Sequence, residues 1–193
     1  MLLVKKFFPS KYAAKPGHDN LVKLFTGFFS SDTGIFPEVK KCLEKKFGTV
    51  DLESPAIDFH HTEYYEKEFG KKLKRIFFSF SELQPLEKIY KAKLITGEIE
   101  KKFCDAGRRR VNLDPGYIDM AKLVLFTTKD YSHRLYLGEN IYGEVTLKFE
   151  KGVFAAWPWT YPDYKTREYT DFFMKVRGIY HEALKKKRSR TGI

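Results

Sequence analysis

The chain has 193 residues, of which 42% are hydrophobic and 17% aromatic, and it carries a formal net charge of +11. This length suits one domain, and the apolar content excludes a chain that is disordered along most of its length. The positive charge favours anionic partners such as nucleotides or RNA. Cys42 and Cys104 are isolated, so neither a disulfide framework nor a zinc knuckle is predicted. The lack of a disulfide framework suits a reducing cytoplasm, which is the expected location. No apolar run approaches the ~20 residues of a membrane span, so no membrane segment is expected.

The first half of the chain predicts a ferredoxin-like order of elements. Apolar runs predict the strands, and the helical spacing of Phe36, Val39, Leu43 and Phe47, ended by Gly48, predicts the first helix. In chain order the predicted elements are a buried strand over 21–30, a helix over 36–47, extended chain over 49–59, a strand over 72–80, a helix from Pro85 to Phe103 and a strand over 108–113. This order is that of a split βαβ unit.

The second half predicts an extension of that core. Residues 119–126 leave two alternatives open, a short helix capped by Asp119 or a strand over 122–127. Apolar runs over 134–137, 141–150 and 153–157 then alternate with turn residues, which predicts an antiparallel meander. A final helix over 166–187 has aromatic residues at helical spacing and should pack them on the sheet. We therefore expect one α+β domain over 21–184, a variable extension over 1–20 and a basic, frayed tail over 185–193.

Residues 107–117 form the most polar of the predicted strands. On a continuous strand Arg108, Arg110, Asn112 and Asp114 share one face and Arg109 faces away. Guanidinium groups match phosphate oxygens, so substitution of Arg108 or Arg110 is predicted to harm ligand binding more than substitution of Arg109. Pro115 and Gly116, after Asp114, have the form of a type II turn, which would aim Asp114 and Tyr117 rigidly. The alternative is that Asp114 and Glu144 neutralise these arginines in a buried network.

Other polar residues stand at the ends of apolar runs. Thr128 and Lys129 offer a hydroxyl and an ammonium group, and His133 lies beside Arg134. Alternation over 141–149 places Glu144 with Tyr142, Thr146 and Lys148, opposite Val145 and Leu147. The candidate catalytic residues are Glu144, His133 and Asp114, because a carboxylate or imidazole can transfer a proton. The candidate ligand-binding residues are Arg108, Arg110, Asn112, Tyr117, Lys122, Thr128, Lys129 and Arg134.

Two further segments contain residue types that are common in sites. Asp58, His60, His61 and Glu63 suggest metal ligands, but adjacent histidines on a strand point to opposite faces, so no metal site is predicted. The aromatic segment 157–164 either stacks on a ligand's rings or caps the open end of the core. The sequence identifies no cofactor.

Six segments, over 107–117, 122–125, 127–131, 133–137, 142–147 and 158–164, together resemble an uncharacterised prokaryotic family of unknown function. The match extends from Leu21 to Tyr180. Members are sometimes labelled GTP-binding proteins, so the resemblance implies a single-domain soluble protein with a nominal nucleotide link and no assigned catalytic residues. A conventional GTPase is not expected, because the chain has no GxxxxGK[ST] loop and Thr128-Lys129-Asp130 is one residue short of the guanine-reading pattern.

Three functions are consistent with these residues. The first is a site for a phosphate-bearing ligand, a nucleotide or an RNA end, with or without phosphoryl or nucleotidyl chemistry. The second is a non-enzymatic RNA-binding module that uses the basic surface and exposed aromatic rings. The third is a structural or regulatory adaptor, which predicts arginines satisfied by local carboxylates and no open polar pocket beside them.

Overall fold

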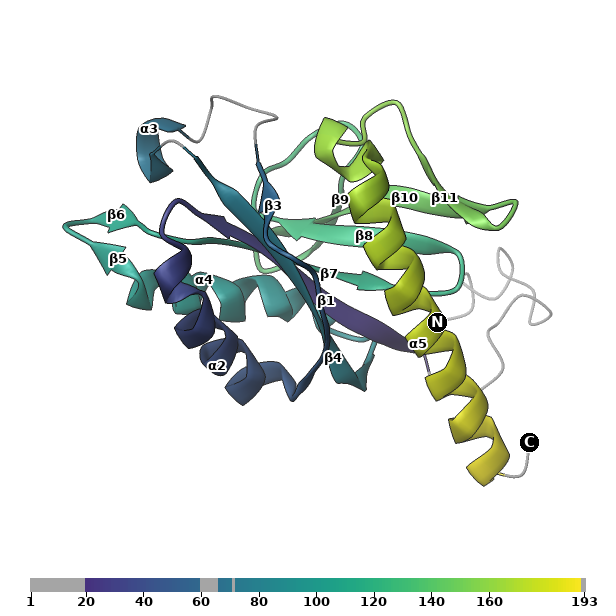
Figure 1. The fold of residues 1–193 in the computed structure, drawn as a ribbon. Helices are drawn as coiled ribbons and strands as arrows, with labels where there is room; N and C mark the ends of the chain where they lie inside the picture. The colour runs from purple at the N-terminus through teal and green to yellow at the C-terminus, as the bar shows by residue number, and fades with distance from the viewer. Residues whose placement is uncertain (1–19, 60–65, 71, 192–193) are drawn as a thin grey trace, which may run out of the picture.

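The computed structural model describes residues 20–59, 66–70 and 72–191 (Figure 1). The strands are β1 (Leu21–Ser30), β2 (Val50–Glu53), β3 (Ile57–Asp58), β4 (Lys74–Pro85), β5 (Cys104–Asp105), β6 (Arg108–Arg109), β7 (Asn112–Ile118), β8 (Lys122–Thr127), β9 (Leu135–Gly138), β10 (Ile141–Glu150) and β11 (Val153–Ala156). The helices are α2 (Phe36–Phe47), α3 (Glu66–Phe69), α4 (Ala92–Lys102) and α5 (Arg167–Thr191), with 3-10 turns η2 (Thr33–Ile35), η4 (Ile89–Lys91) and η5 (Pro162–Lys165). His60, His61 and Glu63, and residues 1–19 of the predicted extension over 1–20, lie outside the described residues.

One large sheet carries the fold. Its strands follow the order β11-β10-β8-β7-β1-β4-β2, with β3 beside β4 and β9 beside β10. The part β7-β1-β4-β2 is antiparallel throughout and has the strand order of the ferredoxin-like split βαβ unit. The predicted α+β class and core are thus confirmed. The meander adds β8, β10, β9 and β11 at the β7 edge of this core.

Helices cover both faces of the sheet (Figure 1). Helices α2 and α4 lie on one face, where Val39, Leu43 and Ile99 pack with side chains from β1, β4 and β7. Helix α5 crosses the other face, and Phe173 and Val176 join a cluster with Phe25 and Phe77. The aromatic stripe predicted for the last helix is therefore buried on the sheet. This helix also continues through the predicted tail to Thr191.

The predicted strand over 108–113 is wrong in one respect. Arg108 and Arg109 form β6, which pairs with β5 in a separate two-stranded hairpin, and the main sheet begins again only at Asn112. The hairpin turn consists of Ala106 and Gly107, both with positive φ, and a glycine adopts this backbone without strain. Because the chain turns between the hairpin and β7, the predicted common face of Arg108, Arg110, Asn112 and Asp114 does not form.

The predicted type II turn is also wrong. Pro115 and Gly116 lie inside β7, opposite Thr26 and Phe25 of β1. Gly116 has no positive φ and fits here because its backbone approaches a neighbour closely: a Cβ would lie 2.3 Å from the carbonyl oxygen of Val124. Glycine within this strand therefore permits close strand packing instead of a turn.

Other boundaries differ from the sequence pattern. Pro85 ends β4, opposite Leu21, and does not open a helix; the helix begins at Ala92 after a 3-10 turn. Of the two alternatives for 119–126 the strand is correct, and Asp119 accepts hydrogen bonds from the N–H groups of Ala121 and Lys122 in the preceding turn.

The meander forms as predicted, but a register shift between Val145 and Leu147 interrupts the alternation of β10. Val145 packs on the α2 and α4 side, whereas Leu147 packs under α5. The two residues therefore do not share the predicted face, because one extra residue in a strand reverses the side chains that follow it. Within the described part of the chain, no helix combines the length and apolar character needed to cross a membrane.

Candidate functional site

The sheet opens where β7 and β8 separate. Only three residue pairs join these strands, Gly116 with Leu125, Tyr117 with Val124 and Ile118 with Leu123. Beyond Gly116, β7 continues along β1 and β8 continues along β10. Counted back from Ile118, Pro115 is the first residue of β7 that has no partner in β8. A proline has no N–H group for a ladder hydrogen bond. The divergence leaves a cavity of about 820 Å³ between the ferredoxin-like core and the meander.

Residues from both layers line this cavity. Helix α4 contributes Lys93, Gly97 and Glu100 from one side of the sheet, and the segment 159–164 covers the other side. Its deep walls are buried polar side chains, among them Arg75, Asn112 and Glu144, each less than 10% exposed. Its outer wall carries exposed Tyr131, Trp159 and Tyr161. The cavity thus grades from a buried polar interior to an aromatic rim.

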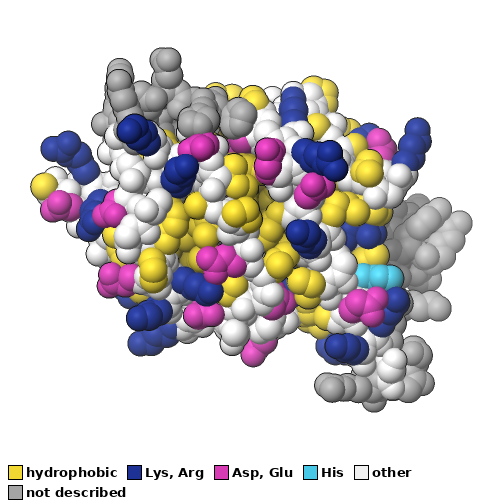
Figure 2. Space-filling model, in the orientation of Figure 1, with side chains coloured by type: hydrophobic (Ala, Val, Ile, Leu, Met, Phe, Trp, Pro, Cys, Tyr) yellow, Lys and Arg dark blue, Asp and Glu magenta, His cyan; other side chains and the backbone are white. Residues whose placement is uncertain are grey.

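The cavity contains equal numbers of basic and acidic side chains. The basic residues are Arg75, Lys93, Arg109, Lys129 and Arg134, and the acidic residues are Glu68, Glu100, Asp114, Glu144 and Asp163. Positive and negative groups are also intermixed on the molecular face in Figure 2. Most of the cavity's cations are therefore already partnered by carboxylates.

Arg75 lies at the deep end of the cavity. Its side chain is 4% exposed, and its guanidinium group lies 4.4 Å from the ring centroid of Phe59. The ion pairs to Asp114 and Asp163 are long, 3.5 and 3.6 Å. No described residue accepts a hydrogen bond from its Nε atom. Arg75 is thus a buried cation whose hydrogen-bonding capacity is only partly used, an arrangement that costs free energy.

Asp114 is a junction between the core and helix α4. Lys93 lies 3.5 Å from one carboxylate oxygen and also donates to the Leu113 carbonyl. Asn112 donates to the other oxygen at 2.9 Å. The carboxylate therefore has cations on two sides, Arg75 and Lys93, and a fixed amide beside it.

Glu144 organises the meander side of the cavity. Its side chain is 2% exposed, and Oε2 accepts from Arg134 Nε at 2.9 Å and lies 3.1 Å from His133 Nε2. Arg134 also donates to the Tyr161 hydroxyl at 2.7 Å, and the His133 ring stacks on Trp159. Burial raises the pKa of Tyr161, so its hydroxyl stays protonated at neutral pH. A buried carboxylate thus fixes the orientation of both His133 and Arg134.

Arg109 connects the hairpin to the cavity. It forms a bidentate ion pair with Glu68 at 2.6 and 2.8 Å, and it donates to Asn112 and Glu100 at 3.2 and 3.4 Å. The hydrogen bond from Arg109 lowers the pKa of Glu68. Burial raises the pKa of Glu100 more than Lys93 and the Leu113 N–H lower it. Arg109, predicted to face away, is therefore the arginine of the triplet that reaches the large cavity.

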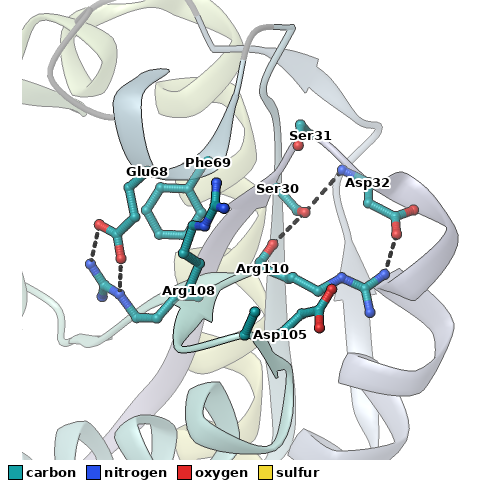
Figure 3. A pocket seen from close by; sticks show the side chains of 10 residues that line it. Ser30, Ser31, Asp32, Glu68, Phe69, Asp105, Arg108 and Arg110 are labelled. Carbon is teal, nitrogen blue, oxygen red and sulfur yellow. Dashed lines mark hydrogen bonds and ion pairs between the residues drawn. The ribbon is translucent and has the colours of Figure 1, made fainter.

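Arg108 and Arg110 line a second, smaller cavity of about 350 Å³ together with Arg109 (Figure 3). Arg110 is paired with Asp32 at 2.5 Å, and Ser30 donates to the Arg110 carbonyl. Arg108 forms no ion pair with a described residue. Three carboxylates, Asp32, Glu68 and Asp105, balance the three arginines here as well.

Seven of the eleven predicted site residues line the large cavity: Asn112, Asp114, Thr128, Lys129, His133, Arg134 and Glu144. Arg108 and Arg110 lie in the smaller cavity. Tyr117 packs beside Phe126 on the opposite face of β7, where burial raises its pKa to about 12. Lys122 pairs with Asp119 at the other end of β8 from Thr127, roughly 17 Å away along the strand.

Sequence reasoning missed Arg75, Lys93 and Glu100. Arg75 had a detectable signal, because it alternates with the buried Phe77 on one face of a strand, where an arginine is unusual. Lys93 and Glu100 had none, since they lie on a mixed-charge helix that resembles a solvated surface. Among the described residues no group of three or more His, Cys, Asp or Glu side chains is arranged to hold a metal ion.

Fold and site together define an α+β protein with a ferredoxin-like core, a β-meander and a polar cavity between them. Residues 20–180 match the family described as Domain of unknown function (DUF4416), and the chain belongs to this family. No curated protein and no solved structure matches the chain significantly.

Proposed function

We propose that the large cavity binds a small phosphate-bearing molecule, a nucleotide or the phosphorylated end of an RNA. The observation that carries this proposal is the open cavity itself, whose basic groups come from elements far apart in the sequence. Its volume of about 820 Å³ lies within the range of small-molecule sites. A merely structural ion-pair network does not require such an opening.

The outer end of the cavity suits the phosphate. Lys129 is exposed there, next to Thr128 and close to Arg134. Arg134 pairs with Glu144 there, and Lys129, which acts electrostatically on Glu68, is a second cation at this rim. Tyr131 supplies an exposed aromatic surface beside these cations, and the Trp159 ring, already stacked with His133 and Trp157, adds its exposed part. Aromatic rings beside cations are the combination that nucleotides meet in many sites.

The pairing of the arginines with carboxylates agrees with only one part of the adaptor alternative. That alternative expects arginines neutralised by local carboxylates and no open polar pocket. The structure shows the neutralised arginines but also shows an open pocket beside them. We therefore favour ligand binding over a purely structural network.

The proposal also assigns proton-transfer roles for phosphoryl or nucleotidyl chemistry. Glu144 holds the His133 ring through Nε2, and no described residue is bonded to the other ring nitrogen. Such an oriented imidazole is a common proton-transfer group. In this scheme Glu144 is a positioning residue.

Tryptophan fluorescence can test the binding proposal directly. The chain has two tryptophans, Trp157 and Trp159, and Trp159 lines the cavity. Titration with nucleoside monophosphates should change this fluorescence saturably. Lys129→Ala should weaken binding about tenfold, because one charged hydrogen bond to phosphate is lost. Lys41→Ala, an exposed lysine on α2 that lines neither cavity, is the matched control and should bind as the wild type does.

The two variants separate a specific site from general charge attraction. If Lys41→Ala weakens binding as much as Lys129→Ala, the attraction is not specific to the cavity. If no phosphate-bearing compound changes the fluorescence or releases heat on mixing, the proposal is wrong.

A further inference from the structure

The deep end of the cavity contains polar groups that lack protein partners. Tyr164 is 2% exposed and lines the cavity, yet no described residue bonds its hydroxyl. The Nε atom of Arg75 is likewise buried and has no hydrogen-bond partner among the described residues. Buried polar groups are nearly always hydrogen-bonded, because leaving one unsatisfied costs about 1–3 kcal/mol. Both residues line the same cavity, which points to a ligand group that bonds them.

The local charges limit what that group can be. Arg75 and Lys93 are balanced by Asp114 and Asp163, which lie within 3.6 Å of them. A phosphate placed here would lie beside two carboxylates in a weakly screened interior, which is unfavourable. An uncharged group does not meet this repulsion.

The deep end of the cavity offers both hydrogen-bond donors and a hydrogen-bond acceptor. Arg75 Nε can only donate, and burial raises the pKa of Tyr164 well above its usual range, so its hydroxyl also remains available to donate. The Asp114 carboxylate, 28% exposed, can only accept. A matching ligand group therefore carries acceptors and donors side by side.

We infer that the deep end of the cavity recognises an uncharged group with neighbouring hydrogen-bond acceptors and donors, and that the ligand's phosphate stays at the outer end near Lys129. Sugar hydroxyls and nucleobase edges share this chemistry. The orientation of the ligand rests on the proposed function, whereas recognition at the deep end does not.

Tyr164→Phe is the sharpest variant for this inference, because it removes only the hydroxyl. If the hydroxyl serves a ligand, the variant should unfold at an equal or higher urea concentration than the wild type, since an unsatisfied buried group is gone. It should also bind a nucleoside monophosphate at least about fivefold more weakly. Tyr169→Phe is the matched control: Tyr169 is buried and its hydroxyl has no described partner either, but it does not line the cavity. It should keep wild-type affinity.

The probes are nucleoside monophosphates with each of the four bases, the corresponding nucleosides, ribose 5-phosphate and inorganic phosphate, measured by calorimetry. Equal affinity for the four monophosphates and ribose 5-phosphate assigns the deep end to the sugar, and a preference among the bases assigns it to a base edge.

Binding of a nucleoside that depends on Tyr164 but gains nothing from the phosphate supports the inference and contradicts the proposed function. Binding of phosphate compounds that Tyr164→Phe leaves unchanged, or inorganic phosphate as the tightest probe, overturns the inference alone. If no probe binds, both are overturned.

Discussion

Glu100 shows how a single residue couples the site to stability. Its carboxylate accepts a hydrogen bond from the Leu113 N–H at 2.6 Å, at the point where β7 enters the sheet, and reaches Arg109 with its other oxygen. Burial nevertheless raises its pKa above the ordinary value of 4.5. The protonated form is therefore relatively favoured in the folded chain, and the ionised form costs stability.

Glu100→Gln tests this directly. Because the folded pKa is raised, the stabilising effect of protonated Glu100 is complete below its unfolded pKa and is lost as pH rises through the folded pKa. The free energy of unfolding of the wild type, relative to Glu100→Gln, should therefore fall as pH rises from about 4.5 towards 7. The glutamine oxygen can still accept from Leu113. Urea unfolding at stepped pH gives the difference, and a difference that rises with pH would show that Arg109 and Lys93 outweigh burial.

At the scale of residues, sequence alone identified much of the polar lining of the large cavity. Thr128, Lys129, His133, Arg134 and Glu144 were recognisable because polar groups stand at the ends of apolar runs. The local pattern could not show which cations meet which carboxylates. That pairing depends on chain segments far apart, as with Arg109 and Glu68, which are 41 residues apart.

At the scale of elements, the divergence of β7 and β8 creates the cavity, and the close approach at Gly116 limits where it begins. An alanine Cβ at Gly116 would lie 2.3 Å from a backbone oxygen and 2.7 Å from the Phe25 ring. Gly143 is also in a strand of the sheet, but there the nearest atom is the end of the flexible, partly exposed Leu137 side chain, at 2.9 Å.

Gly116→Ala should therefore lower the free energy of unfolding by at least about 2 kcal/mol, because the backbone cannot move aside cheaply. Gly143→Ala should cost less than about 1 kcal/mol, since Leu137 can change rotamer. Chemical denaturation of both variants measures the contrast. If Gly116→Ala lowers the free energy of unfolding as little as Gly143→Ala does, β7 and β8 tolerate a wider separation than the structure indicates.

The order of elements was predictable, because hydrophobic periodicity and turn residues mark each strand and helix of the ferredoxin-like core. The errors fall where backbone conformation is decided by tertiary pairing. Pro115 and Gly116 have the sequence of a turn but lie between two neighbouring strands, and the register shift in β10 leaves no mark in the sequence.

At the scale of the whole molecule, the net charge of +11 does not locate the site. Both cavities are balanced by carboxylates, so the excess positive charge lies elsewhere on the molecule. The large cavity is instead defined by shape, as the place where the meander leaves the core. Residues from the α5 side of the sheet and residues of α4 on the other side line it together.

A crystal structure after soaking with a nucleoside monophosphate tests the central claim most directly. The predicted result is density between β7 and β8, with the sugar or the base beside Asp114, Arg75 and Tyr164 and the phosphate near Lys129. Density confined to the smaller cavity, against Arg108 and Arg110, or no bound compound at all, would contradict the account.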